Sequence, residues 1–134
     1  MWCVMENSKN NKYSVESFNL MLKTAKEKIA DNNELTTFQI LIIESPKNNL
    51  FYDFVNYMLP NESSKENEIL NKLKENEDTE ISKIICMWND GCVDLPSFHF
   101  RKSICELNEK NKDAEILLNG KDGFFVSKID RTLK

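Results

Sequence analysis

The chemically versatile side chains of this sequence are densest in one stretch near its middle. These residues are Asp90, Cys92, Asp94, His99, Arg101 and Cys105. They follow a predicted strand and lead into a predicted helix. Ligands of α/β sheets gather at such places, because loops converge there and helix N–H groups carry partial positive charge. The stretch is a candidate site for an anion or a polar partner. The alternative is structural, with Asp90 in a turn and Asp94 capping the helix.

A thiol nucleophile is the sharpest chemistry that this stretch suggests. Cys92 or Cys105 would need activation by His99, the one histidine of the sequence. Direct contact between His99 and Cys105 is not expected, because they lie nearly two helical turns apart on different faces. The distance from Cys92 to His99 depends on the path of the loop. If the protein is an enzyme, its predicted catalytic residues are His99, Cys92, Asp94 and Arg101, but unpaired cysteines are most often small buried hydrophobes.

The cysteines, the histidine and the glycines of this sequence do not have the spacing typical of zinc sites or of nucleotide-binding motifs. Zinc ligands typically come in pairs about two to four residues apart, whereas Cys86, Cys92, His99 and Cys105 have five, six and five residues between them. Paired carboxylates such as Asp90 and Asp94 suit acid–base or magnesium chemistry, but turn formation and solvation are the favoured explanation for them. The three glycines match neither nucleotide-binding fingerprint. We therefore expect no metal and no cofactor.

Length and composition indicate one globular domain. With 134 residues, 40% of them hydrophobic, the chain can bury a single core. We expect residues 1–12 to form a flexible N-terminus and residues 13–134 a single α/β domain. The net charge of −4 offers no attraction to nucleic acid or anionic lipid, and no apolar run reaches the ~18 residues of a membrane span. Four irregularly spaced cysteines indicate reduced thiols in a cytoplasmic protein.

Apolar periodicity and breaker residues predict the elements that position these side chains. Predicted helices cover residues 14–31, 50–59, 64–76 and 97–110, and predicted strands cover 36–44, 80–88, 114–118 and 124–129. Ser63 followed by Glu66 resembles a capping box, which supports the third helix. Two glycines between the last strands favour a hairpin turn. The expected fold is α/β (α+β), a small four-stranded mixed sheet flanked by three to four helices, with a C-terminal β-hairpin.

The predicted second helix carries aromatic residues at three-residue steps, namely Phe51, Phe54 and Tyr57. Its apolar residues exceed one helical face, so Tyr52 or Tyr57 should stay partly exposed unless both pack in the core. Tyrosine is favoured at interfaces, and Tyr52 and Tyr57 are the predicted binding residues for a protein partner. The leading hypothesis is a small regulatory or interaction protein, such as an inhibitor or immunity-type protein of a mobile element. The alternative is a small enzyme with its site at residues 90–105.

Overall fold

The computed structural model describes residues 15–32, 37–55 and 63–133, in which each of three helical segments is followed by two strands. The helices are α2 (Asn19–Asp31), α3 (Ser63–Glu75), α4 (Phe98–Leu107) and α5 (Ile129–Thr132), with a 3₁₀ helix over Glu109–Asp113. The strands are β1 (Gln39–Glu44), β2 (Leu50–Val55), β3 (Lys83–Trp88), β4 (Val93–Asp94), β5 (Glu115–Gly120) and β6 (Gly123–Lys128). No helix in these ranges is long and apolar enough to span a membrane.

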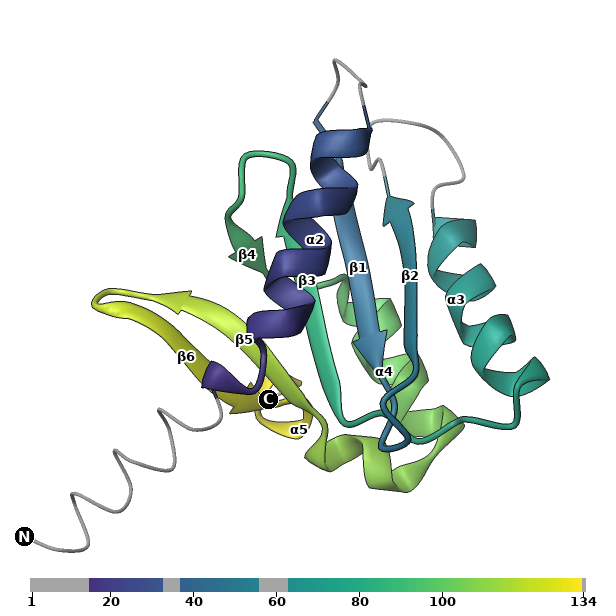
Figure 1. The fold of residues 1–134 in the computed structure, drawn as a ribbon. Helices are drawn as coiled ribbons and strands as arrows, with labels where there is room; N and C mark the ends of the chain where they lie inside the picture. The colour runs from purple at the N-terminus through teal and green to yellow at the C-terminus, as the bar shows by residue number, and fades with distance from the viewer. Residues whose placement is uncertain (1–14, 33–36, 56–62, 134) are drawn as a thin grey trace, which may run out of the picture.

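One mixed sheet runs through the middle of the molecule (Figure 1). Its strand order is β2-β1-β3-β5-β6, and β4 pairs with β3 off this path. β3 is antiparallel to β1 and parallel to β5, so α4 lies in the crossover between β3 and β5. The α/β class and the C-terminal hairpin predicted from the sequence are confirmed. The sheet has two more strands than expected, β2 and β4.

Helices cover both faces of the sheet, with α2 in front of it and α4 behind it in the view of Figure 1. On the α2 face, Met21 and Ala25 are buried against Ile40 and Ile42 of β1. Side chains alternate along a strand, so the intervening residues of β1 point to the opposite face. Each buried aliphatic side chain of this size stabilises the fold by about 1.5–3 kcal/mol.

The opposite face of the sheet carries α3 and α4, which hold the candidate site. Ile69 and Leu73 of α3 and Phe100 and Ile104 of α4 are fully buried in the same cluster. The strands contribute Leu41, Ile43, Ile84 and Cys86 to this cluster. Both helices are therefore fixed against the centre of the sheet by their apolar faces. Their polar residues near the first turns are held in fixed positions as a result.

The predicted helix over 50–59 is wrong, because Leu50–Val55 forms strand β2. The chain turns after β1, where the N–H of Ser45 donates to the carbonyl oxygen of Asn49 at 2.9 Å. Asn48 has a φ of 66°, a left-handed conformation that asparagine tolerates. β2 then pairs antiparallel with β1, and aromatic residues suit such a position as well as they suit a helix. Tyr57 lies outside the described residues.

Candidate functional site

A hydrogen-bonded pair of polar side chains, a buried Glu66 and a half-buried Ser97, joins the first turn of α3 to the start of α4. The hydroxyl Oγ of Ser97 lies 2.9 Å from each carboxylate oxygen of Glu66 and donates to the carboxylate. Glu66 is only 1% exposed. Burying an acid is unfavourable unless its oxygens are hydrogen-bonded, which the Ser97 hydroxyl helps to achieve. The fold has thus placed a carboxylate in the interior, at the junction of two helix starts.

The sequence of α3 explains why Glu66 faces inward. Ile69, Leu70 and Leu73 follow it at the spacing that places residues on one helical face, and all three are buried. Glu66 continues this apolar stripe by one turn toward the start of the helix. Packing of the stripe against the sheet therefore carries the carboxylate inward with it.

The sequence of α4 explains the position of Ser97. Ser97 is the N-cap of α4, and its hydroxyl oxygen accepts a hydrogen bond from the backbone N–H of Phe100 at 3.1 Å. Phe100 is fully buried and fixes the first turn of α4 on the sheet. The Ser97 hydroxyl thus has two partners, the Phe100 N–H as donor and the Glu66 carboxylate as acceptor.

Cys86 of β3 is a buried thiol of the same core. Burial raises the pKa of the Cys86 thiol well above its usual range, and the charges of Asp94 and Glu66 raise it further. A thiol with a raised pKa stays protonated and is a poor nucleophile. Cys86 therefore acts here as a small apolar residue.

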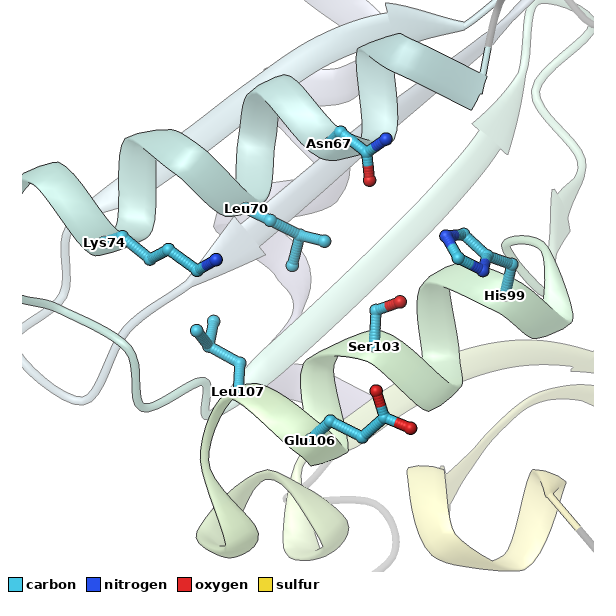
Figure 2. Close-up of a pocket in the computed structure, with 7 residues that line it drawn as sticks. All are labelled: Asn67, Leu70, Lys74, His99, Ser103, Glu106 and Leu107. Carbon is cyan, nitrogen blue, oxygen red and sulfur yellow. The ribbon is translucent and has the colours of Figure 1, made fainter.

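A groove of about 660 Å³ runs between α3 and α4 (Figure 2). It is lined by Asn67, Leu70, Lys74, His99, Ser103, Glu106 and Leu107. Figure 2 shows Asn67 and His99 at the end where both helices begin, and Lys74 and Leu107 at the other end. Asn67 follows Glu66 directly, and His99 lies two residues beyond Ser97. The end of the groove nearest the helix starts therefore adjoins the Glu66–Ser97 pair along both helices.

His99 is the one predicted catalytic residue that lines this groove, whereas Cys92 and Asp94 lie beyond β3. Asp94 accepts hydrogen bonds from Trp88 Nε1 at 3.3 Å and from the N–H of Leu95 at 2.7 Å. Cys92 is exposed, and a hydrogen bond with Asp90, together with the charge of Asp90, raises the pKa of its thiol. The Cys92 thiol is accordingly less reactive than an ordinary exposed thiol.

Arg101 fixes α4 to the C-terminal turn. Its Nε donates to the carbonyl oxygen of Pro96 at 3.0 Å, and one of its terminal nitrogens donates to that of Thr132 at 2.6 Å. It also lies 5.6 Å from the ring centroid of Phe98. Among the residues that the structure describes, no hydrogen bond or ion pair joins two of His99, Cys92, Asp94 and Arg101. The structure therefore does not assemble these four residues into one catalytic group.

The weaker alternative of a zinc site also has no geometry to support it. Across residues 15–32, 37–55 and 63–133, no three side chains of His, Cys, Asp or Glu gather closely enough to hold a metal ion. Cys86 is buried, whereas Cys92 is exposed at the other side of the turn.

Of the two tyrosines predicted to bind a protein partner, Tyr52 lies among the described residues. Tyr52 is 37% exposed, but it lies on β2 instead of a helix. The ammonium group of Lys28 lies 5.1 Å from the centroid of its ring, so part of the ring faces a cation of α2. Tyr57 is not among the described residues. A ridge formed by successive helical turns is therefore absent from Leu50–Val55.

The fold described above is similar to that of two solved cytidine deaminase structures. The crystal structure of the cytidine deaminase from Mycobacterium leprae matches with a TM-score of 0.59 at 14% identity, covering 84% of this chain and 92% of that one. A mutant cytidine deaminase from Mycobacterium tuberculosis matches with a TM-score of 0.60 at 11% identity, covering 87% and 93%. At these identities the likeness concerns the fold. The chain matches no protein-family model and no curated protein.

These matches correct the leading hypothesis from the sequence. The interpretation as a protein-binding inhibitor or immunity-type protein is wrong, because most of the chain shares the fold of small enzymes. Glu66 is not among the residues that the sequence predicted for a site, because its pattern with Ser63 resembles a capping box. Its register with Ile69, Leu70 and Leu73 was the available signal, since a charged residue in line with an apolar stripe is unusual unless it is paired.

Proposed function

We propose that the protein is a small enzyme that acts on a cytidine-like molecule, with Glu66 as its proton-transferring group. The observation that carries the proposal is the hydrogen bond from Ser97, at the start of α4, to the buried carboxylate of Glu66 on α3. A buried carboxylate held at a helix junction is the kind of group that general acid–base catalysis uses. The proposed site belongs to the region of the sequence-based enzyme alternative, residues 90–105, and extends it to α3.

The order of residues along the chain supports this assignment. Zinc deaminases carry the signature H-x-E, followed later by P-C-x-x-C, in which the glutamate is a general acid and base and not a zinc ligand. This chain has Glu66 on α3 and Pro96-Ser97 at the start of α4, in the same order. The two segments also meet in space through the Ser97–Glu66 hydrogen bond. This order and this contact support Glu66 as the counterpart of the proton-transferring glutamate.

The chemistry of a carboxyl group suits a cytosine-like base. A carboxylate accepts hydrogen bonds from an exocyclic amine, and it can take the proton of a water molecule that adds to C4 of the base and deliver that proton to the amine, which leaves as ammonia. The residue is regenerated once the proton has been returned. Asn67 and His99, at the adjoining end of the groove, supply further hydrogen-bonding groups for a polar ligand. These contacts make a nucleoside a better match than an apolar molecule.

The experiment compares the wild-type chain with Glu66→Gln and Glu75→Gln. Glutamine at position 66 keeps the shape and can still accept from Ser97, but it cannot transfer a proton. Glu75 is exposed at the far end of the same helix and provides the matched control. Cytidine binding is measured by isothermal titration calorimetry, and conversion of the nucleoside is followed by chromatography.

We expect wild type and Glu75→Gln to bind and convert cytidine alike, while conversion by Glu66→Gln falls by about 10²–10⁴-fold. A folded wild-type chain that does not bind cytidine saturably contradicts the proposal. So does binding without any change in the nucleoside, or conversion that is unaffected by Glu66→Gln. The cytoplasmic location and a protein partner stay predictions from the sequence.

A further inference from the structure

The deaminase signature implies a zinc ion, so the side chains at its ligand positions decide whether one fits here. Zinc in these enzymes is bound by one His or Cys, two residues before the glutamate, and by the two cysteines of P-C-x-x-C. Zinc sites in proteins are built from Cys, His, Asp or Glu side chains. A chain that lacks such residues at all three positions cannot form this site.

Every ligand position of the signature is occupied here by a residue that is not a typical zinc ligand. Ser64 stands two residues before Glu66, and Ser97 and Phe100 stand where the two cysteines would be. The chain therefore keeps the glutamate and the proline of the signature but has none of its three zinc ligands.

The structure gives Ser97 and Phe100 other tasks. The Ser97 hydroxyl caps α4 through the Phe100 N–H and donates to Glu66, so both of its hydrogen-bonding roles are already used. The Phe100 side chain is fully buried in the apolar cluster between the sheet and the two helices. No group of three potential ligands exists among the described residues. The donor set at this position therefore does not fit zinc.

We infer that the site works without a metal, and that the Ser97 hydroxyl is the positioning group that holds the Glu66 carboxylate. Ser97 and Phe100 stand where the signature has two cysteines. In this chain, Ser97 hydrogen-bonds Glu66 and Phe100 packs in the apolar cluster. The inference rests on the proposed function for the location of the site. It concerns the metal content of the chain, which is measured independently of any reaction.

The test measures zinc in the full-length chain after expression in zinc-supplemented medium and dialysis, by inductively coupled plasma mass spectrometry. Thermal unfolding is recorded in parallel with added Zn²⁺ and with EDTA, since a ligand that binds only the folded state raises the Tm. A Cys92→Ser variant is included because exposed Cys92 can bind zinc adventitiously. Ser97→Ala provides the comparison at the site itself.

We expect no stoichiometric zinc in the Cys92→Ser chain and no change of its Tm with Zn²⁺ or EDTA. Zinc that is present in wild type and lost in Cys92→Ser supports the inference, because it then belongs to the surface thiol. Stoichiometric zinc in Cys92→Ser overturns it, and most directly if Ser97→Ala removes that zinc. Failure of cytidine to bind would refute the proposed function without altering the zinc content, so the two failures are distinguishable.

Discussion

The side-chain oxygen of Asn111 lies 2.7 Å from the backbone nitrogen of Ile81 and accepts its hydrogen bond in the fully buried interior. The amide nitrogen of Asn111 donates to the carbonyl oxygens of Thr79 at 2.9 Å and Ile104 at 2.8 Å. One side chain thus ties the entrance of β3 to the end of α4 and to the 3₁₀ helix that follows. These contacts help to determine where α4, and with it Ser97, rests on the sheet.

Replacing Asn111 with alanine should be costly for this reason. The change leaves the Ile81 N–H and two carbonyl oxygens without their partner, so the free energy of unfolding should fall by about 2–3 kcal/mol. Urea unfolding followed by circular dichroism measures the loss. Asn76→Ala is the control, because the side-chain amide of Asn76 donates to the carbonyl oxygen of Lys72 at the exposed end of α3. Equal stability of the two variants would contradict the role assigned to Asn111.

Ser97→Ala should destabilise the fold through two lost hydrogen bonds. Removal of an N-cap hydroxyl typically costs about 1 kcal/mol, and Glu66 also loses a donor in the interior, for a total of about 1–3 kcal/mol. Ser97→Thr keeps the hydroxyl and should recover most of this loss. Ser103→Ala, within the same helix, should leave stability nearly unchanged. The unfolding midpoints of the three variants in urea test this ranking.

Cys92 should react faster once Asp90 loses its charge. Asp90 raises the pKa of the Cys92 thiol by its hydrogen bond and by its charge, so less thiolate is present at mildly alkaline pH than in an ordinary cysteine. Asp90→Asn should lower this pKa and accelerate alkylation by iodoacetamide, as followed by peptide mass spectrometry. The difference should vanish at pH values well above the thiol pKa, where both chains are fully deprotonated.

Cys105 is the internal reference in that experiment. Burial, followed by the charge of Asp130, raises the pKa of its thiol, and Asp90 plays no part. Its alkylation rate should be the same in both chains. A parallel change at Cys105 would mean that Asp90→Asn loosens the fold in general.

The C-terminal hairpin should depend on Gly120. A Cβ at this position would lie 2.8 Å from a ring carbon of Phe125 and 2.9 Å from the carbonyl oxygen of Gly123, and the latter is backbone that cannot turn aside. We expect Gly120→Ala to lower stability by about 1–3 kcal/mol. Asp122→Ala, at the exposed tip of the turn, should have little effect. Thermal unfolding of both variants provides the measurement.

Much of the fold follows from local sequence patterns. The runs around Ile40–Ile43 and Ile84–Ile85 are apolar and β-branched, and they form the central strands as predicted. Strand β2 was mistaken for a helix because Phe51 and Phe54 satisfy a three-residue spacing. Its β character comes from pairing with β1, a tertiary contact that decides between the two conformations. β4 contains only two residues, which is too short for any periodicity to reveal.

The candidate site was less accessible to sequence reasoning than the fold. Of the four residues predicted to be catalytic, His99 lines the groove between α3 and α4, whereas Cys92, Asp94 and Arg101 do not. Glu66 and Ser97 are 31 residues apart, and each has a local explanation as a helix-start residue. Only the packing of α3 beside α4 brings them together. A pairing of this kind leaves no periodic trace in either segment.

The pairing of β1 with β3 has a consequence for how the chain is made. Gln39 lies opposite Trp88 and Glu44 opposite Lys83, so the central ladder joins segments that β2 and α3 separate in the sequence. Closing so long a loop carries a larger entropic cost than closing a hairpin, and such pairings are slow. During synthesis the β1–β2 hairpin can pair once Val55 has left the ribosome. The edge of β1 that pairs with β3 can form its hydrogen bonds only after Trp88 has also left the ribosome.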